Sequence, residues 1–264
     1  MRRPFLLTAI VSLLLLGGLI ALVYRETQSQ SNQRVKPLVV YCAAALKPAM
    51  EAVAAEYERE TGRTVEFRFG NSEQILAQAS IGGEGDLFLP ADGSYVRAAR
   101  ASDIATESVS LAKMRAVVLV RPGNPRGIAR FDDLLQKDLR LGQANPDAAA
   151  IGKVTRDHLH KSARWDRLHA NTLVYHTTVT DAANAVLVGA NDAAIVWDAV
   201  AANYPSLAVV RLRELEGAIG TIEIALLKST TDPDAARRFV QFVRDPMHGQ
   251  KAFRAAGFTD LEPW

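Results

Sequence analysis

The sequence has little of what marks an enzyme, a metal centre or a disulfide scaffold. Its 264 residues include one cysteine, Cys42, which cannot form an intramolecular disulfide, and five histidines. His158 and His160 lie two apart on a predicted helix and point to different faces, and no other histidine falls in a ligand-spaced motif. A Gly-x-Ser-x-Gly elbow and a Walker loop are also missing. We therefore expect neither an enzyme nor a bound metal or cofactor.

Neither sign of charge dominates the chain, whose formal net charge is +2. Residues 1–36 hold five basic residues and one acidic residue, so the remainder of the chain carries a net charge of −2. A nucleic-acid-binding domain needs clustered lysines and arginines on its folded part. The charge distribution therefore excludes nucleic acid as a partner.

The one long hydrophobic run lies at the N-terminus. Two arginines precede an uncharged stretch from Phe5 to Tyr24, which is long enough to span a bilayer and longer than the usual hydrophobic region of a cleaved signal peptide. The sequence favours an uncleaved N-terminal transmembrane helix over a signal peptide, with the folded part outside the cytoplasm. Residues 26–36 are rich in Gln and Ser and predict a flexible tether. Residues 1–36 are thus interpreted as an anchor or signal followed by a tether.

From Pro37 onward, short apolar strands alternate with helices, a pattern typical of an α/β fold with mostly parallel sheets. Strands are predicted at residues 38–42, 65–69, 86–89, 115–120, 140–144, 173–176, 193–197, 208–212 and 222–227. Helices are predicted at residues 47–60, 72–80, 93–101, 132–135, 149–160, 165–169, 180–188 and 234–244. These strands are too many for one small doubly wound sheet. We therefore predict two lobes joined by crossing strands, with a ligand at the strand-to-helix turns that face the gap.

The turn at residues 41–48 is the most informative of these places. A β-branched strand ends in Cys42 and three alanines, and Pro48 then opens an amphipathic helix that stops at Gly62. Small residues at such a turn leave the backbone N–H groups of the helix N-terminus open, which is the geometry of an anion site. A buried strand and helix of any α/β domain would give the same pattern. The neighbouring motifs decide between the two.

Six short motifs follow one another in the order and spacing of a known family. They are YCAAAL (41–46), FGNS (69–72), GDLFLPAD (85–92), NPD (145–147), DAAIVW (192–197), and FVQF (239–242) with GQ (249–250) and GF (257–258). With them, residues 37–258 resemble the periplasmic solute-binding proteins of molybdate and tungstate ABC importers. The resemblance implies an α/β, two-lobed type II periplasmic-binding-protein fold in which each lobe is a mostly parallel sheet flanked by helices. We expect lobe I at 37–116 and 222–264, and lobe II at 117–221.

The resemblance also implies how a ligand is held. In that family, neutral hydroxyl and backbone N–H donors from both lobes surround a tetrahedral dianion, and fixed dipoles replace its water. No metal and no obligatory lysine or arginine takes part. The ligand-binding positions that the resemblance implies for this chain are Ala44, Ala45, Asn71, Ser72, Ile151, Val179 and Trp197.

Three positions depart from the family pattern. Ala45 stands where the family has its first hydroxyl, so that hydrogen bond comes from backbone alone or is absent, a loss of about 1–3 kcal/mol if nothing replaces it. Trp197 stands where some members have a tyrosine, and it can donate but cannot accept. Glu73 replaces a residue that is usually glycine or serine. Either its carboxylate points to solvent, or the ligand is not a simple dianion.

Several polar residues near these motifs have a simpler interpretation. Asp86 and Asp92 look catalytic as a pair, but aspartates at strand ends commonly bond nearby backbone, so we expect both to cap turns. Asp147 is expected to cap the helix that follows it, unless its turn contacts the ligand. Ser72 can equally be a helix N-cap, because an N-cap and an anion site use the same donors. Asp181 and Asp198 are interpreted in the same two ways.

The sequence therefore predicts a monomeric, membrane-anchored binding protein on the periplasmic or extracellular face of the cytoplasmic membrane. It captures a small tetrahedral oxyanion, molybdate or tungstate, by hinge closure and presents it to the permease subunits of an ABC importer. Three alternatives stay open. One is a binder of the same fold for another small anion, motivated by Glu73 and Ala45. The others are an anchored ligand sensor without a transport role, and an enzyme, for which no nucleophile–base pair is visible.

Overall fold

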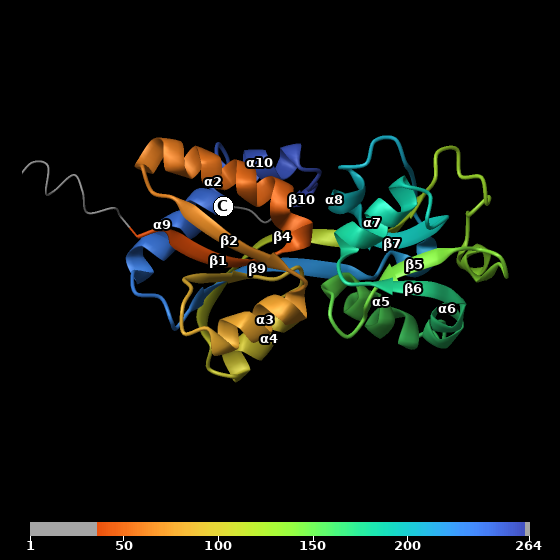
Figure 1. Cartoon of the computed structure of the whole chain (residues 1–264), viewed down its shortest axis with the longest axis horizontal. Coiled ribbons are helices and arrows are strands. Elements are labelled where there is room, and N and C mark those ends of the chain that lie inside the picture. Colours follow the sequence, from red (N-terminus) through yellow and green to blue (C-terminus); the bar gives the residue numbers. More distant parts are fainter. Residues whose placement is uncertain (1–35, 262–264) are drawn as a thin grey trace, which may run out of the picture. The chain divides into compact units, whose positions relative to one another are not determined.

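The structure is a computed structural model that describes residues 36–261, which Figure 1 draws in colour. The folded unit begins at Pro37. The transmembrane helix expected at residues 5–24 lies outside the described residues, as does the tether up to residue 35. Among residues 36–261, no helix is both long and apolar enough to cross a membrane.

One group of strands and helices is built by the first part of the folded unit. Its elements are β1 (Leu38–Ala43), η1 (Ala44–Leu46), α2 (Lys47–Thr61), β2 (Val65–Gly70), α3 (Ser72–Ile81), β3 (Leu87–Leu89) and α4 (Gly93–Ala101). The three strands are parallel in the order β2-β1-β3, and β9 (Ile219–Leu227) joins β3 in antiparallel orientation. Because β1 and β2 are parallel and adjacent, η1 and α3 begin at the same edge of the sheet.

The second group repeats this arrangement. Its elements are η2 (Phe131–Leu135), β5 (Leu141–Ala144), α5 (Ala150–His160), α6 (Trp165–Asn171), β6 (Thr172–His176), α7 (Val179–Leu187), β7 (Ala193–Trp197), α8 (Asp198–Ala201), β8 (Ala208–Val210) and η3 (Arg213–Leu215). Its strands β7, β5 and β6 are parallel in that order. Here α5 follows β5 and α7 follows β6, so both helices begin at one edge of this sheet.

Two long antiparallel strands, β4 (Ala105–Val120) and β9, connect the groups, as Figure 1 shows. From Ala105 to Arg115, β4 pairs with β9, and from Ala116 onward it pairs with β7. The change of partner falls between these two neighbouring residues. The two lobes and crossing strands expected from the sequence are therefore present, each lobe with three parallel strands and an antiparallel neighbour.

The structure extends β4 beyond the prediction, which included only residues 115–120. In the first half of the strand, Glu107, Ser108, Ser110 and Lys113 interrupt the apolar residues, and all four are exposed or half-buried. Residues 106–110 are exposed or half-buried one after another, so both faces of this stretch are partly open to solvent and no continuous apolar run marks it. The hydrophobic pattern of the sequence therefore reveals only the second half of β4, which is buried on both faces.

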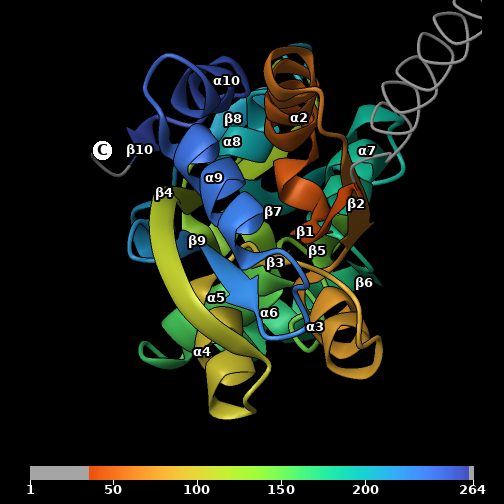
Figure 2. The same cartoon turned by 90° about the vertical axis from the view of Figure 1, so that its left-hand side faces the viewer.

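The C-terminal segment returns to the first lobe. It consists of α9 (Pro233–Arg244), α10 (Gly249–Ala255) and β10 (Asp260–Leu261), which pairs with β4. Figure 2 shows α10 beside α2. The ring of Tyr57 on α2 lies 5.0 Å from that of Phe239 and 5.1 Å from that of Phe242, in edge-on geometry. The short elements η1, α8, η3, α10 and β10 are absent from the prediction.

The helix α2 shows how the sequence sets these elements. Pro48 lies in its first turn, where a missing N–H costs nothing, and Gly62 follows its last turn with φ +71°. Its apolar residues recur at the helical period and are buried against the sheet.

Cys42 is completely buried, and burial raises the pKa of its thiol well above the ordinary value. It is thus a small core residue, as its position in a strand predicts.

Candidate ligand-binding site

A pocket lies where the strand-to-helix turns of the two lobes face each other. It is lined by Ala43, Ala44, Ala45, Gly70, Asn71, Ser72, Ala91, Ala149, Ala150, Ile151, Thr178, Val179 and Trp197. All seven positions implied by the resemblance are among them. The other six were missed, although each lies within two residues of an implied position or belongs to one of the six motifs. The pocket could thus be predicted from the strand-to-helix turns, but not residue by residue.

The pocket is small and free of charged side chains. Its empty space measures about 250 Å³, including the part open to solvent. Pockets for drug-sized molecules measure about 300–1,000 Å³. None of the residues that line the pocket in the described part of the chain is acidic or basic. The pocket therefore suits an ion of a few atoms that is held by neutral groups.

Four helical segments begin at this pocket: η1, α3, α5 and α7. The backbone N–H groups of a first helical turn have no partner within the helix. Neither Ala43 before η1 nor Ala149 before α5 makes a side-chain cap, so these starts leave their N–H groups to the pocket. The partial positive charge of the longer helices adds to the same effect. The pocket is thus electropositive without a cationic side chain.

The sequence left open whether Ser72 is a helix N-cap, and the structure gives that role to its neighbour Asn71. The Oδ1 atom of Asn71 accepts from the backbone N–H of Gln74 at 2.8 Å, so Asn71 is the N-cap of α3. Ser72 is 1% exposed, and its Oγ accepts from the backbone N–H of Ala91 at 3.2 Å. A hydroxyl that accepts one hydrogen bond can still donate its own proton. The N-cap interpretation of Ser72 is therefore wrong, and its O–H remains a donor at the pocket wall.

Trp197 ends β7 with its side chain fully buried. Its indole Nε1 is one of the few buried polar side-chain atoms in the described residues that have no hydrogen-bond partner. The ring packs so closely on Gly220 that a Cβ there would lie 2.8 Å from the ring atom Cη2. An unpaired buried donor costs about 1–3 kcal/mol. A ligand in the pocket that accepts from Nε1 would remove this cost.

The departures at Ala45 and Glu73 have different outcomes. Ala45 is 6% exposed and lines the pocket. The nearby hydroxyl of Thr178 does not replace the missing one, because it donates to Oδ2 of Asp181 at 2.8 Å.

Glu73 is exposed and is not part of the pocket wall. The pKa of the Tyr95 phenol is raised, mainly by burial of the ring and secondly by the charge of Glu73. The sequence left two options for Glu73, and the structure supports the one in which its carboxylate points to solvent.

The aspartates have structural contacts. Asp92 caps α4 by accepting from the N–H of Ser94, and Asp86 accepts from the N–H of Val39 at 2.9 Å. Asp181 belongs to the capping box of α7, and Asp198 accepts from two backbone N–H groups. The N-cap interpretation of Asp147 is wrong. The residue before α5 is Ala149, and the exposed carboxylate of Asp147 pairs with Arg156 instead.

Known proteins resemble this chain over most of its length. The molybdate-binding protein ModA of Mycobacterium tuberculosis is 29% identical over 98% of this chain and 99% of its own. A putative binding protein of Haemophilus influenzae is 30% identical over 84% of this chain and 90% of its own. In fold, the periplasmic molybdate-binding protein of Azotobacter vinelandii matches with a TM-score of 0.71, at 21% identity and with 84% of this chain and 98% of the other covered.

The match to the Azotobacter protein shows the expected two-lobed periplasmic-binding-protein fold. A family model described as bacterial extracellular solute-binding protein matches residues 38–259. This match covers most of the chain, including both lobes and every residue of the pocket wall. The chain therefore belongs to the family of bacterial extracellular solute-binding proteins, and it is a binding protein rather than an enzyme.

Proposed function

We propose that the chain captures a small tetrahedral oxyanion, molybdate or tungstate, in the pocket between its lobes and delivers it to the permease of an ABC importer. The observation that carries this proposal is the fully buried, unpartnered indole N–H of Trp197 in a pocket wall made of helix starts. Donors without partners suit an anion, whereas a cation would need oxygen ligands. The relative from Mycobacterium tuberculosis, named for molybdate, supports the choice of ion.

The proposed contacts come from both lobes. Lobe I contributes the N–H groups of Ala44 and Ala45, the hydroxyl of Ser72 and the side-chain amide of Asn71. Lobe II contributes the N–H groups of Ile151 and Val179 and the indole N–H of Trp197. Several neutral donors can replace the water around a dianion, because each carries part of the positive charge that the ion needs. With no counter-charge in the pocket wall, release to a permease does not require breaking an ion pair.

Closure of the two lobes follows from this division of donors. A ligand that bonds to both lobes binds the closed state more tightly than the open one, so it shifts the population toward closure. The hinge lies where β4 changes partners between Arg115 and Ala116 and where β9 runs alongside. We propose residues 37–116 and 222–264 as lobe I and residues 117–221 as lobe II, with the bound in β4 one residue beyond this change of partner.

The location outside the cytoplasm agrees with the family to which the chain belongs. We assign the apolar residues 5–24 as an uncleaved anchor, which would hold a monomer close to its permease in the same membrane. A tethered binding protein meets the permease at a raised effective concentration, set by the length of its linker. Residues 26–36 would be that linker.

A thermal-shift series tests the proposal. The full-length chain, purified in a mild detergent, is heated with molybdate, tungstate, sulfate or phosphate. At about 100 times Kd a ligand stabilises the folded state by about 2.7 kcal/mol, which corresponds to a Tm rise of roughly 5–10 °C for a chain of this size. We expect this rise with molybdate and tungstate. If none of the four ions raises Tm at millimolar concentration, the oxyanion function is wrong.

A pair of variants ties the effect to the pocket. Ala150→Asp places a carboxylate in the first turn of α5, where an acidic residue favours the helix but repels a bound anion. Ala52→Asp adds the same charge on the exposed face of α2. The first variant should lose the ligand-dependent Tm rise, and the second should keep it.

The absence of a hydroxyl at Ala45 favours a second candidate, namely another small anion bound in the same pocket. The same series separates the two candidates. A rise with sulfate or phosphate but not with molybdate or tungstate would select this alternative and leave the transport role in place.

A further inference from the structure

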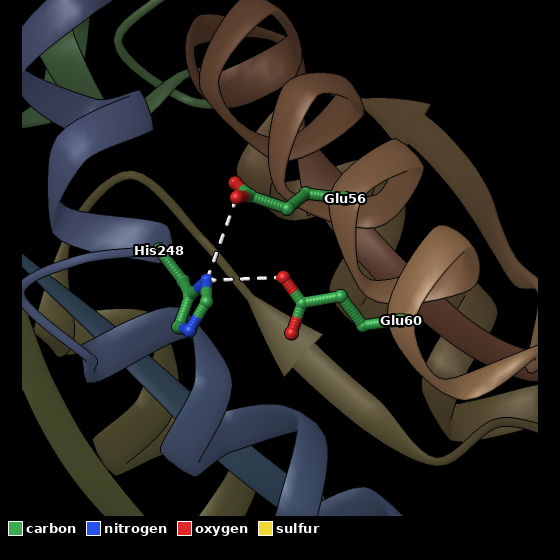
Figure 3. Close-up of side chains that lie close together, drawn as sticks. All are labelled: Glu56, Glu60 and His248. Atoms are coloured by element: carbon green, nitrogen blue, oxygen red, sulfur yellow. Dashed lines mark hydrogen bonds and ion pairs between the residues drawn. The ribbon is translucent and has the colours of Figure 1, made fainter.

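Three potential metal ligands meet on the surface of lobe I, away from the residues of the pocket wall. Glu56 and Glu60 lie one turn apart on α2, and His248 lies in the loop that precedes α10. Figure 3 shows both carboxylates directed at the imidazole of His248 from the adjacent helix. The donor atoms of the three side chains all lie within 4.8 Å of one another. Residues far apart in the sequence thus place two oxygens and one nitrogen together.

Two of the three separations between these atoms match the edges of a tetrahedral metal site. The Nδ1 atom of His248 lies 3.4 Å from Oε1 of Glu56 and 3.5 Å from Oε1 of Glu60. Both separations are long for a charge-assisted hydrogen bond, which is about 2.7–2.9 Å. Ligands at zinc distances of about 2.0–2.2 Å, arranged as a tetrahedron, are separated by roughly 3.3–3.6 Å. The two observed separations fit the edges of a metal site, and they also lie within the range of an ion pair.

The imidazole is held in place by its neighbours. The ring of His248 stacks on Phe242 with the ring centroids 4.4 Å apart and an angle of 20° between the planes. This contact fixes the direction of Nδ1 toward α2. The side chains of Glu56, Glu60 and His248 are 23%, 42% and 30% exposed, so an ion can reach them from solvent. The cluster is therefore partly ordered before an ion arrives and remains accessible to it.

We propose that Glu56, Glu60 and His248 form a site for a divalent transition-metal ion, with zinc as the best match. An imidazole nitrogen and two carboxylate oxygens are common zinc ligands, and water would fill the fourth position. The two carboxylates balance the charge of the ion, once the ion displaces Nη2 of Arg59, which lies 3.6 Å from Oε1 of Glu56. Calcium and magnesium fit less well, because both prefer sites built entirely from oxygen.

Such an ion would fasten the C-terminal segment to the first helix of the lobe. The ligands on α2 and the ligand before α10 come from the two ends of the folded unit, which are otherwise joined there by the contacts of Tyr57 with α9. Because the ligands are assembled only in the folded state, binding free energy would add to folding free energy. The effect is expected on stability and not on the affinity for an oxyanion.

The test uses the full-length chain in detergent, stripped with EDTA and then titrated with zinc chloride in the absence of any oxyanion. We expect one equivalent of zinc to bind and Tm to rise, and one equivalent of cobalt to give the visible absorption of a tetrahedral complex. His248→Ala and Glu56→Gln should each weaken zinc binding at least about tenfold, because even residues that only support metal ligands contribute that much. His160→Ala and Glu58→Gln, which change exposed residues of the same types, should bind zinc as the unmodified chain does.

Either of two results would overturn the proposal. The first is a titration without saturable zinc binding, which would make the cluster an ion pair of a histidine with two glutamates. The second is equal zinc affinity of His248→Ala and the unmodified chain, which would place the ion elsewhere. Molybdate titration of the same variants keeps this outcome separate from the proposed function, since His248→Ala should bind molybdate normally.

Discussion

The backbone N–H of Glu73 donates to the backbone carbonyl of Ala148 at 3.0 Å, and this hydrogen bond joins the two lobes. Glu73 lies in the first turn of α3, whose N–H groups have no partner within the helix. Ala148 lies in the turn that leads into α5. One open donor of a helix start in lobe I is thus satisfied by the facing turn of lobe II. The contact can form only while the two turns lie against each other.

This contact gives a direct measure of closure. Binding of molybdate should slow hydrogen exchange of the Glu73 amide at least about tenfold, because a tenfold change corresponds to about 1.4 kcal/mol in favour of the closed state. Hydrogen exchange with single-residue fragmentation and mass spectrometry measures it. The amide of Ile75, which donates to the carbonyl of Asn71 within the same turn, is the internal control and should change little. If the Glu73 amide exchanged equally slowly with and without molybdate, the hydrogen bond to Ala148 would not depend on ligand-driven closure.

Trp197 supplies a second prediction. Trp197→Phe removes the unpartnered indole N–H and should weaken molybdate binding by about 1–3 kcal/mol, or roughly 5- to 150-fold. The smaller ring also leaves a cavity, whose cost opposes the gain from removing an unpaired buried donor, so the stability of the ligand-free variant should change little. Trp165→Phe makes the same change in α6, at a buried residue that does not line the pocket. It should lose stability but keep the affinity. Isothermal titration and thermal unfolding separate the two effects, and unchanged affinity of Trp197→Phe would remove Trp197 from the site.

The missing hydroxyl at Ala45 predicts a gain of affinity. Ala45→Ser adds a donor at a position that already lines the pocket, and a hydrogen bond to a charged group contributes about 1.5–3 kcal/mol. Molybdate affinity should therefore rise about tenfold or more, as measured by isothermal titration. Ala52→Ser, on the exposed face of α2, is the matched control and should leave the affinity unchanged. An Ala45→Ser variant with unaltered affinity would show that this side chain does not reach the ligand.

The alternation of strands and helices was sufficient to predict two lobes and the turns between them, because each element has its own period of apolar residues. The seven residues implied by the resemblance lie around one pocket for the same reason: they follow the carboxyl ends of parallel strands. Their contact with a ligand stays a prediction.

Details that depend on residues far apart in the chain could not be predicted. The acceptor role of Ser72 toward Ala91 depends on the turn that follows β3, whereas the cap that Asn71 provides to Gln74 is local. The unpaired donor of Trp197 depends on how its ring packs at Gly220 on another strand. The first half of β4 is partly exposed, so its composition is that of a surface segment. Such contacts are set by tertiary packing, and local sequence does not encode them.

Asp192, which precedes β7, is surrounded by basic groups of lobe II. Its carboxylate is 5% exposed and lies 2.6 Å from Nη2 of Arg140, 3.2 Å from Nη2 of Arg126 and 3.7 Å from Nη1 of Arg121. The hydrogen bonds from Arg140 in particular hold the pKa of Asp192 well below its ordinary value. A group whose pKa is lower in the folded state adds stability once it is ionised in both states.

The pH dependence of stability follows from this sign. The contribution of Asp192 should be complete above about pH 5 and should be lost as the pH falls below the unfolded-state pKa of about 3.9. Asp192→Asn should therefore lower the free energy of unfolding by about 1–3 kcal/mol at pH 7, and the difference from the unmodified chain should shrink at pH 3. Urea unfolding at the two pH values measures it, with Asp166→Asn at an exposed position as the control. A difference that stays constant down to pH 3 would mean that the charge of Asp192 does not stabilise the lobe.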